Sequence, residues 1–424
     1  MSNEFTITKA IWSLIGPMVF SSDQQLLARS SVPFLIPVAN RVPWPLQESW
    51  PRSMPSKASS AAYDVFIVGA GPAGAAVAIS LSQVIPSLRV CLADAGKNIP
   101  FRIGESVPPT IKPFLDHLGV SSSFEQTGHS PSFRTLSAWG GPELISNEFF
   151  LHVYHTGWRL DRQCFDRMLI TEAVHCGTEI LSARVCSLKK DENGWLIDCG
   201  TAGRFSARYV VDASGRDAIC SRLLKRVPIK FDRLVACSIF FEQRAPSEAF
   251  STDAAVIEAF RNGWWYTAAI PGNRRVAMLM TDIDIARQLQ VAQLSTWLQY
   301  LAETQYIRPL VATGCPLSPP LIWPASSRYF ACAYPPNMLA VGDAISSFDP
   351  LSSQGIIKAL RSSLFASYAI ADHYLRDDES GSAKYHALMN REFDTYLATR
   401  REYYQQEQRW PDAPFWQRRH QIYK

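Results

Sequence analysis

The residues YDVFIVGAGPAGAAVAISLSQ, Tyr63 to Gln83, decide the fold of this 424-residue chain. The apolar run Tyr63–Val68 predicts a buried strand, and the alanine-rich run after the glycines predicts a helix. Between them, Gly69, Gly71 and Gly74 allow a tight turn, a close approach of the backbone to a pyrophosphate, and close packing of helix on strand. We therefore predict that a Rossmann-type nucleotide-binding unit begins here.

The residues after the first glycines extend this unit. The helix expected to start at Pro72 and Ala73 points the N–H groups of its first turn at a bound phosphate. A second apolar run, residues 88–93, predicts a strand that ends at Asp94. A carboxylate there can accept hydrogen bonds from a ribose diol, although an ordinary strand-end carboxylate fits the same pattern. Pro72, Ala73 and Asp94 thus join the three glycines as expected cofactor-binding residues.

A glycine–aspartate pair lies late in the chain, in LAVGDAISSFDPLSSQGI, residues 339–356. Gly342 and Asp343 resemble the second FAD fingerprint of the p-hydroxybenzoate hydroxylase-like flavoproteins, in which the aspartate contacts the ribityl chain. The N–H groups at the following helix start would stabilise negative charge on a reduced flavin. The residues at this start are Gln354, Gly355 and Ile356. The resemblance implies FAD as the cofactor.

The sequence holds no second glycine-rich nucleotide fold. Electrons are therefore expected from transiently bound NAD(P)H or from a separate flavin reductase.

Four further segments resemble tryptophan-halogenase-like flavoproteins. They are RIGESVPPTIKPFLDHLGV (102–120), GWRLDRQCFDRML (157–169), NGWWYTAAIPGNRR (262–275) and RREYYQQEQRWPDAPFWQRRH (400–420). The last resembles the ending of the LodB-like branch, flavoproteins implicated in hydroxylating a tryptophan of a partner quinoprotein to make cysteine tryptophylquinone. The resemblance, which runs from about residue 62 to 420, implies that Glu105, Ser106 and Arg162 bind the cofactor, Arg162 at the flavin or the pyrophosphate. Arg162 could equally be a local salt-bridge residue.

The residues that a halogenase needs are missing from the matching positions. The place of the halogenase lysine holds Arg134, whose guanidinium stays protonated and is a poor nucleophile. Ser352 stands where halogenases carry a glutamate, and Gln354 stands where they carry the threonine on the halide side. The resemblance therefore implies that the flavin platform is kept without the halogenating residues.

The candidate catalytic residues are Asp349, Trp264 and Trp265. Asp349, which precedes a proline in the flavin-side loop, could orient the cofactor or act as an acid; an ordinary turn carboxylate is the alternative. The two tryptophans, with Tyr266 and Trp139, could wall a dry pocket and stack on an aromatic substrate. Filling of the core or sheet is the alternative for each of these aromatic residues.

These patterns predict an α/β fold in which a Rossmann-type FAD-binding domain is interleaved with a mixed-sheet substrate domain and followed by a helical C-terminal region. Residues 1–60, rich in serine and proline, are expected to form a disordered leader. The other expected parts are an FAD-binding domain (61–185, 206–225 and 330–375), a substrate-binding sheet domain (226–329) and a C-terminal helical region (376–424).

Composition argues against several other classes of protein. The net charge of +4 comes without a basic block with interleaved aromatics, so nucleic acid is not an expected partner. The apolar run Ala10–Phe20 is too short for a membrane span and contains Gly16 and Pro17. Nine scattered cysteines without a CxxC pair favour a reduced, cytoplasmic protein, and no metal site is expected because the pair His152 and His155 lacks a third ligand.

We therefore expect an FAD-dependent monooxygenase that uses O2, through a flavin hydroperoxide, to hydroxylate an aromatic group, in the first instance indole. The LodB-like resemblance implies that the substrate is a tryptophan of a partner quinoprotein. Three kinds of alternative stay open. They are a halogenase-like enzyme or small-molecule aromatic hydroxylase, a flavoprotein reductase of the geranylgeranyl-reductase type, and a non-catalytic maturation factor that docks on its partner.

Overall fold

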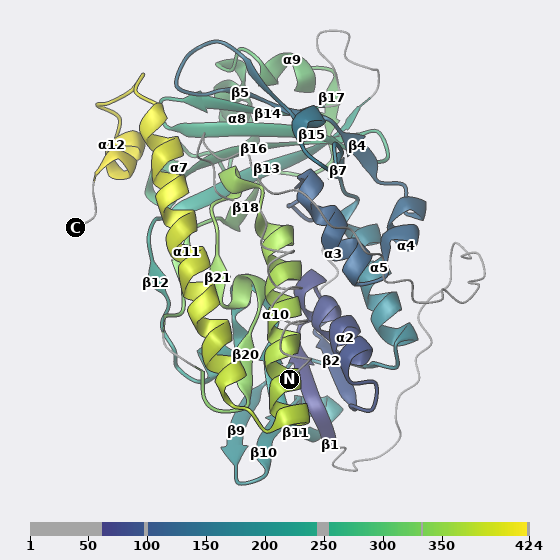
Figure 1. Ribbon diagram of the computed structural model, residues 1–424. Coiled ribbons are helices and arrows are strands. Elements are labelled where there is room, and N and C mark those ends of the chain that lie inside the picture. The colour runs from purple at the N-terminus through teal and green to yellow at the C-terminus, as the bar shows by residue number, and fades with distance from the viewer. Residues whose placement is uncertain (1–61, 97–100, 244–253, 332–333, 422–424) are drawn as a thin grey trace, which may run out of the picture. The chain divides into compact units, whose positions relative to one another are not determined.

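The computed structural model describes residues 62–96, 101–243, 254–331 and 334–421. The expected leader, residues 1–60, lies outside these ranges. The structure is a mixed α/β fold with two large sheets and a helical C-terminal region, as the sequence predicts (Figure 1). The domain boundaries expected from the sequence stay predictions.

A seven-stranded sheet carries the predicted nucleotide-binding unit. β8, β2, β1 and β11 are parallel neighbours in that order; β10 pairs antiparallel with the first half of β11, and β20 pairs parallel with its second half. The strands are β1 (Ala62–Val68), β2 (Val90–Asp94), β8 (Glu179–Ser182), β9 (Ser187–Asp191), β10 (Gly194–Asp198), β11 (Arg204–Asp212) and β20 (Met338–Ala340). β1, β2 and β20 are mostly buried, as expected for parallel strands covered on both faces.

An eight-stranded sheet has the order β17-β13-β16-β15-β14-β5-β6, and β18 also pairs with β13. Its strands are β5 (Arg134–Ala138), β6 (Ile145–Glu148), β13 (Leu234–Gln243), β14 (Ala255–Phe260), β15 (Gly263–Ile270), β16 (Arg274–Asp282), β17 (Gly314–Pro316) and β18 (Leu321–Pro324). β15 and β16 form a hairpin, because they are antiparallel and Ile270 lies opposite Arg274. Gly272 and Asn273 between them take positive φ angles, which glycine and asparagine tolerate in turns.

The described residues also form two three-stranded sheets and six 3-10 helices. The strands are β3 (Ser106–Val107), β4 (Ser130–Ser132), β7 (Gly157–Arg159), β12 (Ile229–Lys230), β19 (Arg328–Tyr329) and β21 (Ser346–Ser347). The 3-10 helices are η1 (Pro109–Ile111), η2 (Phe149–Leu151), η3 (Gly200–Ala202), η4 (Gly215–Asp217), η5 (Gly342–Ala344) and η6 (Pro350–Ser352).

The α-helices are α2 (Pro72–Val84), α3 (Lys112–His117), α4 (Ser121–Gln126), α5 (Arg162–His175), α6 (Ile219–Leu223), α7 (Ile283–Gln288), α8 (Leu294–Ala302), α9 (Ile307–Val311), α10 (Gly355–Arg376), α11 (Ser380–Gln406) and α12 (Pro414–His420). Long α10 packs against α2 on one side and α11 on another (Figure 1). The long helical region that begins at Gly355 consists of two helices, because Asp377 takes a left-handed conformation and ends α10. Within the described ranges, no helix combines the length and the apolar character that a membrane crossing requires.

Candidate functional site

The first glycine turn shows why three glycines are needed. A Cβ on Gly74 would lie 1.9 Å from the Gly69 carbonyl oxygen, and a Cβ on Gly69 would lie 2.5 Å from the carbonyl oxygen of Ala213. These two glycines therefore allow α2, β1 and the end of β11 to pack closely. A Cβ on Gly71 would meet nothing within 4 Å. The backbone at Gly71, just before the helix that begins at Pro72, is thus open to a ligand.

The second glycine turn lies against the first. Gly342, at a φ of +58°, is so close to α2 that a Cβ there would lie 3.1 Å from the Ala73 Cβ. Ser363, on α10, donates a hydrogen bond of 2.8 Å to the Ala73 carbonyl, and Ser362 accepts one of 2.8 Å from the Gly342 N–H. Two turns that are far apart in sequence are therefore joined at one place.

Asp94 and the turn DASGR, residues 212–216 at the end of β11, border the same region. Asp94 ends β2, next to β1, and its carboxylate accepts a hydrogen bond of 3.3 Å from the Gly96 N–H. Asp212 is fully buried and accepts hydrogen bonds from the N–H groups of Cys220 (3.0 Å) and Ser221 (3.3 Å), which fixes the turn; burial raises its pKa. Gly215, in this turn, again has open space where a Cβ would lie.

Asp343 is held by two cations that the sequence analysis did not identify. Lys358 Nζ lies 2.7 Å from Asp343 Oδ1, and Arg216 Nε lies 3.2 Å from Asp343 Oδ2. Burial opposes ionisation of Asp343, but Lys358 and Arg216 outweigh it and lower its pKa. Only the spacing of Lys358, one helical turn after Gly355, hinted that it faces this site.

The start of α10 follows Ser352 and Ser353. The Gln354 side-chain oxygen is buried without a hydrogen-bond partner, and Gly355 has open space where a Cβ would lie. Ile356 is buried at the first turn of the helix. This helix start therefore offers N–H groups and an unused acceptor to a ligand.

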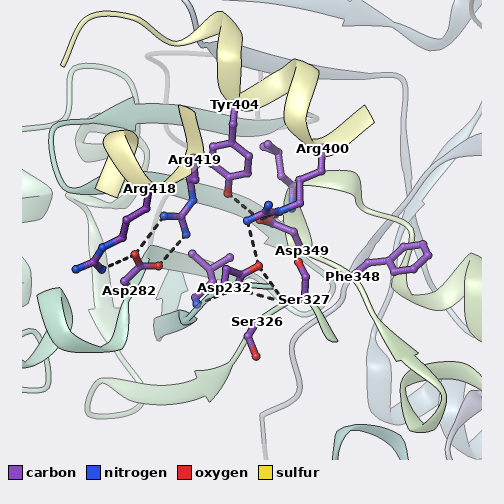
Figure 2. Close-up of polar contacts among 12 residues, drawn as sticks. Asp232, Asp282, Ser326, Ser327, Phe348, Asp349, Arg400, Tyr404, Arg418 and Arg419 are labelled. Atoms are coloured by element: carbon purple, nitrogen blue, oxygen red, sulfur yellow. Dashed lines mark hydrogen bonds and ion pairs between the residues drawn. The ribbon is translucent and has the colours of Figure 1, made fainter. Parts of the chain in front are cut away.

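Asp349 is the centre of a buried polar network (Figure 2). Its carboxylate accepts hydrogen bonds from Arg400 Nε at 3.2 Å and from the Tyr404 hydroxyl at 2.7 Å, and Arg400 also binds Asp232 at 3.0 Å. The Asp349 N–H donates to the Tyr396 hydroxyl at 2.7 Å. Asp349 thus fixes the loop before α10 to α11. With these partners occupied, it is better suited to hold the loop than to move a proton.

The C-terminal end of the chain is fixed to the eight-stranded sheet by a second set of ion pairs in Figure 2. The buried carboxylate of Asp282 binds Arg419 at 2.8 Å and Arg418 at 2.8 Å. Arg419 also lies over the Phe415 ring, 3.4 Å from its centroid. These contacts attach α12 to β16.

Glu105 and its neighbours line a cavity beside the eight-stranded sheet and the start of α5. The lining residues are Phe101, Arg102, Glu105, Leu160, Asp161, Arg162, Gln163, Phe240, Ile270 and Arg274. The Oε2 atom of Glu105 is buried without a hydrogen-bond partner, and burial raises the pKa of this carboxyl group. Ser106 lies 2.7 Å from the Tyr266 hydroxyl oxygen. Burial therefore favours the neutral form of the Glu105 carboxyl group at the cavity.

Arg162 is tied to the protein itself. It forms an ion pair of 3.2 Å with the Asp166 carboxylate and donates a hydrogen bond of 2.6 Å to the Ile103 carbonyl oxygen. The local ion pair that the sequence left open as an alternative is therefore present. The contact of Arg162 with the cofactor stays a prediction.

Trp264 and Trp265 point to opposite faces of β15, because neighbouring side chains alternate along a strand. Trp264 packs near Trp139, with ring centroids 6.3 Å apart, and donates 3.0 Å to the Tyr404 hydroxyl. Trp265 packs on Trp297 of α8, with centroids 4.9 Å apart. Both are almost fully buried. The two tryptophans therefore cannot wall one pocket, and the core-filling alternative fits Trp265 best.

The described residues fit FAD. Gly71, Gly215 and Gly355, from three turns around one region, each have open space where a side chain would start. Gln354 and Glu105 each keep a buried oxygen without a partner, and such an atom costs free energy unless a ligand or water pairs with it. Among the described residues, no group of three or more possible ligands could hold a metal ion.

Comparison with known proteins agrees with this fit. The profile of the tryptophan halogenase family matches residues 64–139 and 142–423. The FAD-dependent oxidoreductase LodB of Marinomonas mediterranea is 34% identical over 366 residues, which cover 84% of this chain and 97% of LodB.

Two solved structures share the fold. The myxobacterial chondrochloren halogenase CndH has a TM-score of 0.77 at 22% identity and covers 85% of this chain and 86% of its own. QhpG, a peptidyl tryptophan dihydroxylase of tryptophylquinone cofactor biogenesis, has a TM-score of 0.63 at 22% identity. The match covers 85% of this chain and 79% of the QhpG chain.

Proposed function

Because this chain belongs to the tryptophan halogenase family, we propose that it is a monooxygenase that hydroxylates the indole ring of a tryptophan in a partner protein. The chain is an FAD-dependent oxidoreductase; the proposal concerns its reaction and its substrate. The similarity to LodB, together with the shared fold of a peptidyl tryptophan dihydroxylase, supports a polypeptide as the substrate.

Arg134 is the observation that carries the choice of oxygen transfer over halogen transfer. By resemblance it occupies the place of the halogenase lysine. It pairs with Glu148, with 3.5 Å between its Nη1 and Oε1 of Glu148. A guanidinium offers no free amine lone pair to capture an electrophilic halogen. The buried amine of Lys358 does not replace it, because it is bound to Asp343 and to the Ser346 carbonyl.

The residues around the site would support this reaction in three ways. When bound and reduced, FAD supplies the activation of O2. The N–H groups at Gly355 and Ile356 favour negative charge at the start of α10. Phe101 and Phe240, stacked with centroids 4.6 Å apart, keep one side of the cavity apolar and exclude water. Glu105 is a candidate hydrogen-bond or proton donor there, because burial raises the pKa of its carboxyl group.

The overall reaction balances with an external reductant. A ring C–H becomes C–OH with one oxygen atom of O2, and the other oxygen atom leaves as water. The two electrons come from NAD(P)H, either directly or through a separate flavin reductase.

Mass spectrometry of a co-expressed candidate quinoprotein tests the proposal. We expect one or two added oxygen atoms on a tryptophan-containing peptide, and none with the Gly71→Leu variant as control. An unmodified peptide with an FAD-loaded enzyme and a working electron donor would contradict the proposal. A halide-dependent chlorinated product would favour the halogenase alternative, and an anaerobic reaction the reductase. An effect on the partner that survives in Gly71→Leu would favour the maturation factor.

A further inference from the structure

Lys358 is a buried lysine with a carboxylate partner at the edge of the proposed flavin site. Its side chain is 1% exposed, and its Nζ binds Asp343 Oδ1 at 2.7 Å and the Ser346 carbonyl. The same nitrogen lies 4.5 Å from the centroid of the Phe348 ring. One ammonium group thus joins α10, η5 and β21.

The Asp343 carboxylate is paired with two cations and stays partly exposed. Lys358 and Arg216 contact its two oxygens, whereas 28% of the Asp343 side chain stays exposed. An ionised carboxylate has about four acceptor positions, so roughly two remain after these contacts. Asp343 can therefore accept hydrogen bonds from hydroxyl groups of a ligand while it stays bound to Lys358.

Stability alone does not explain this pair. A buried ion pair often contributes little net stability, because the cost of removing both charges from water offsets their attraction. A fixed orientation of the exposed carboxylate oxygen is what the lysine adds. Ser346 and Phe348 belong to the loop that leads to α10, so the same contact also orders that loop.

We propose that Lys358 is a positioning residue for FAD, which orients the Asp343 carboxylate toward the hydroxyl groups of the cofactor's ribityl chain. The positive charge of Lys358 is part of this role, because an ammonium group makes a stronger, charge-assisted hydrogen bond to the Asp343 carboxylate than a neutral amine does. Burial lowers the pKa of Lys358 to about 8, although Asp343 opposes the shift. Deprotonation above that pH should therefore loosen the contact.

The other charged groups near Lys358 are Asp343 and two arginines. Arg216 and Arg328 face it from the DASGR turn and β19, and both are guanidinium groups. The neighbouring helix α2 carries no charged side chain in residues 72–84. On α11, Glu392 is paired with Arg361.

Titration of the FAD-stripped, full-length chain with FAD tests the proposal without any substrate, so its result does not depend on the proposed hydroxylation. We expect Lys358→Met to raise the dissociation constant on the order of tenfold or more, as loss of a charged hydrogen bond does. Wild-type affinity should fall as pH rises through about 8, the pKa of Lys358. The variant should not show this fall.

Arg361→Met is the matched control, because it removes another buried cation from α10 and leaves Glu392 unpaired. Equal losses of FAD affinity in Lys358→Met and Arg361→Met would overturn the proposal and leave Lys358 a structural role. A double-mutant cycle with Asp343→Asn gives a second test. We expect Lys358→Met to add little once Asp343 is replaced; additive losses would contradict the proposed action through Asp343.

Discussion

Gly71 and Gly74 allow cofactor binding and folding to be separated by two substitutions three residues apart. Gly71 has an extended backbone, with φ −71° and ψ −176°, which any residue adopts, and space for a side chain. Gly74 has no such space, because a Cβ there would lie 1.9 Å from the Gly69 carbonyl oxygen and 3.2 Å from the Ala213 Cβ. We therefore expect Gly71→Leu to block FAD and Gly74→Ala to destabilise the fold.

The magnitudes follow from these contacts. Overpacking of a closed contact costs about 1–3 kcal/mol and sometimes more, so Gly74→Ala should lower the free energy of unfolding by about 2–4 kcal/mol. Gly71→Leu should change it by less than about 0.5 kcal/mol, apart from a small loss of capping. Its leucine fills the space next to the backbone N–H groups, and we expect FAD affinity to fall at least about 100-fold, roughly 2.7 kcal/mol.

Urea unfolding of the FAD-free proteins measures stability, since bound cofactor would add its own stabilisation to the folded state. Flavin absorbance of the purified proteins and fluorescence titration measure FAD binding. A Gly71→Leu protein that still holds one FAD per chain would refute the placement of the pyrophosphate at Gly71. A Gly74→Ala protein as stable as the wild type would refute the packing argument.

Two further predictions concern buried charges. Arg400→Met leaves the carboxylates of Asp349 and Asp232 without their shared cation, and we expect the free energy of unfolding in urea to fall by about 3–5 kcal/mol. Arg376→Met, which breaks the more exposed ion pair with Asp372, is the control. A loss in Arg400→Met no larger than in this control would contradict the prediction. Burial raises the pKa of Glu105 above its usual 4.5, so the folded protein binds the extra proton and wild-type stability relative to Glu105→Gln should decline as pH rises above 4.5. Parallel pH profiles of the two proteins would show that Glu105 ionises normally.

Local pattern was sufficient for the parts of the fold in which neighbours in sequence act together. The glycine turn from Gly69 to Gly74 was predicted because steric limits on φ and close packing act over a few residues. The opposite directions of Trp264 and Trp265 could also have been read from strand alternation. Residue type alone groups the two tryptophans, whereas the two-residue period of a strand places them on opposite faces.

Contacts between distant segments could not be predicted in the same way. Asp343 meets Arg216 across the fold, and Asp349 meets Arg400 of α11; no local periodicity encodes either pair. Asp349 was predicted as a catalytic candidate because only its turn was visible in the sequence. The break at Asp377 depends on one left-handed residue, which a helical pattern alone does not reveal.

The central claim is that oxygen gas, and not halide or water, supplies the atom added to a tryptophan of a partner protein. Reaction under isotopically heavy O2, followed by mass spectrometry of the partner's tryptophan-containing peptides, tests it most directly. The account predicts that the heavy isotope appears in the indole ring under labelled O2 and is absent when only the water is labelled. An indole modified without label from O2, or one that carries a halogen, would contradict it.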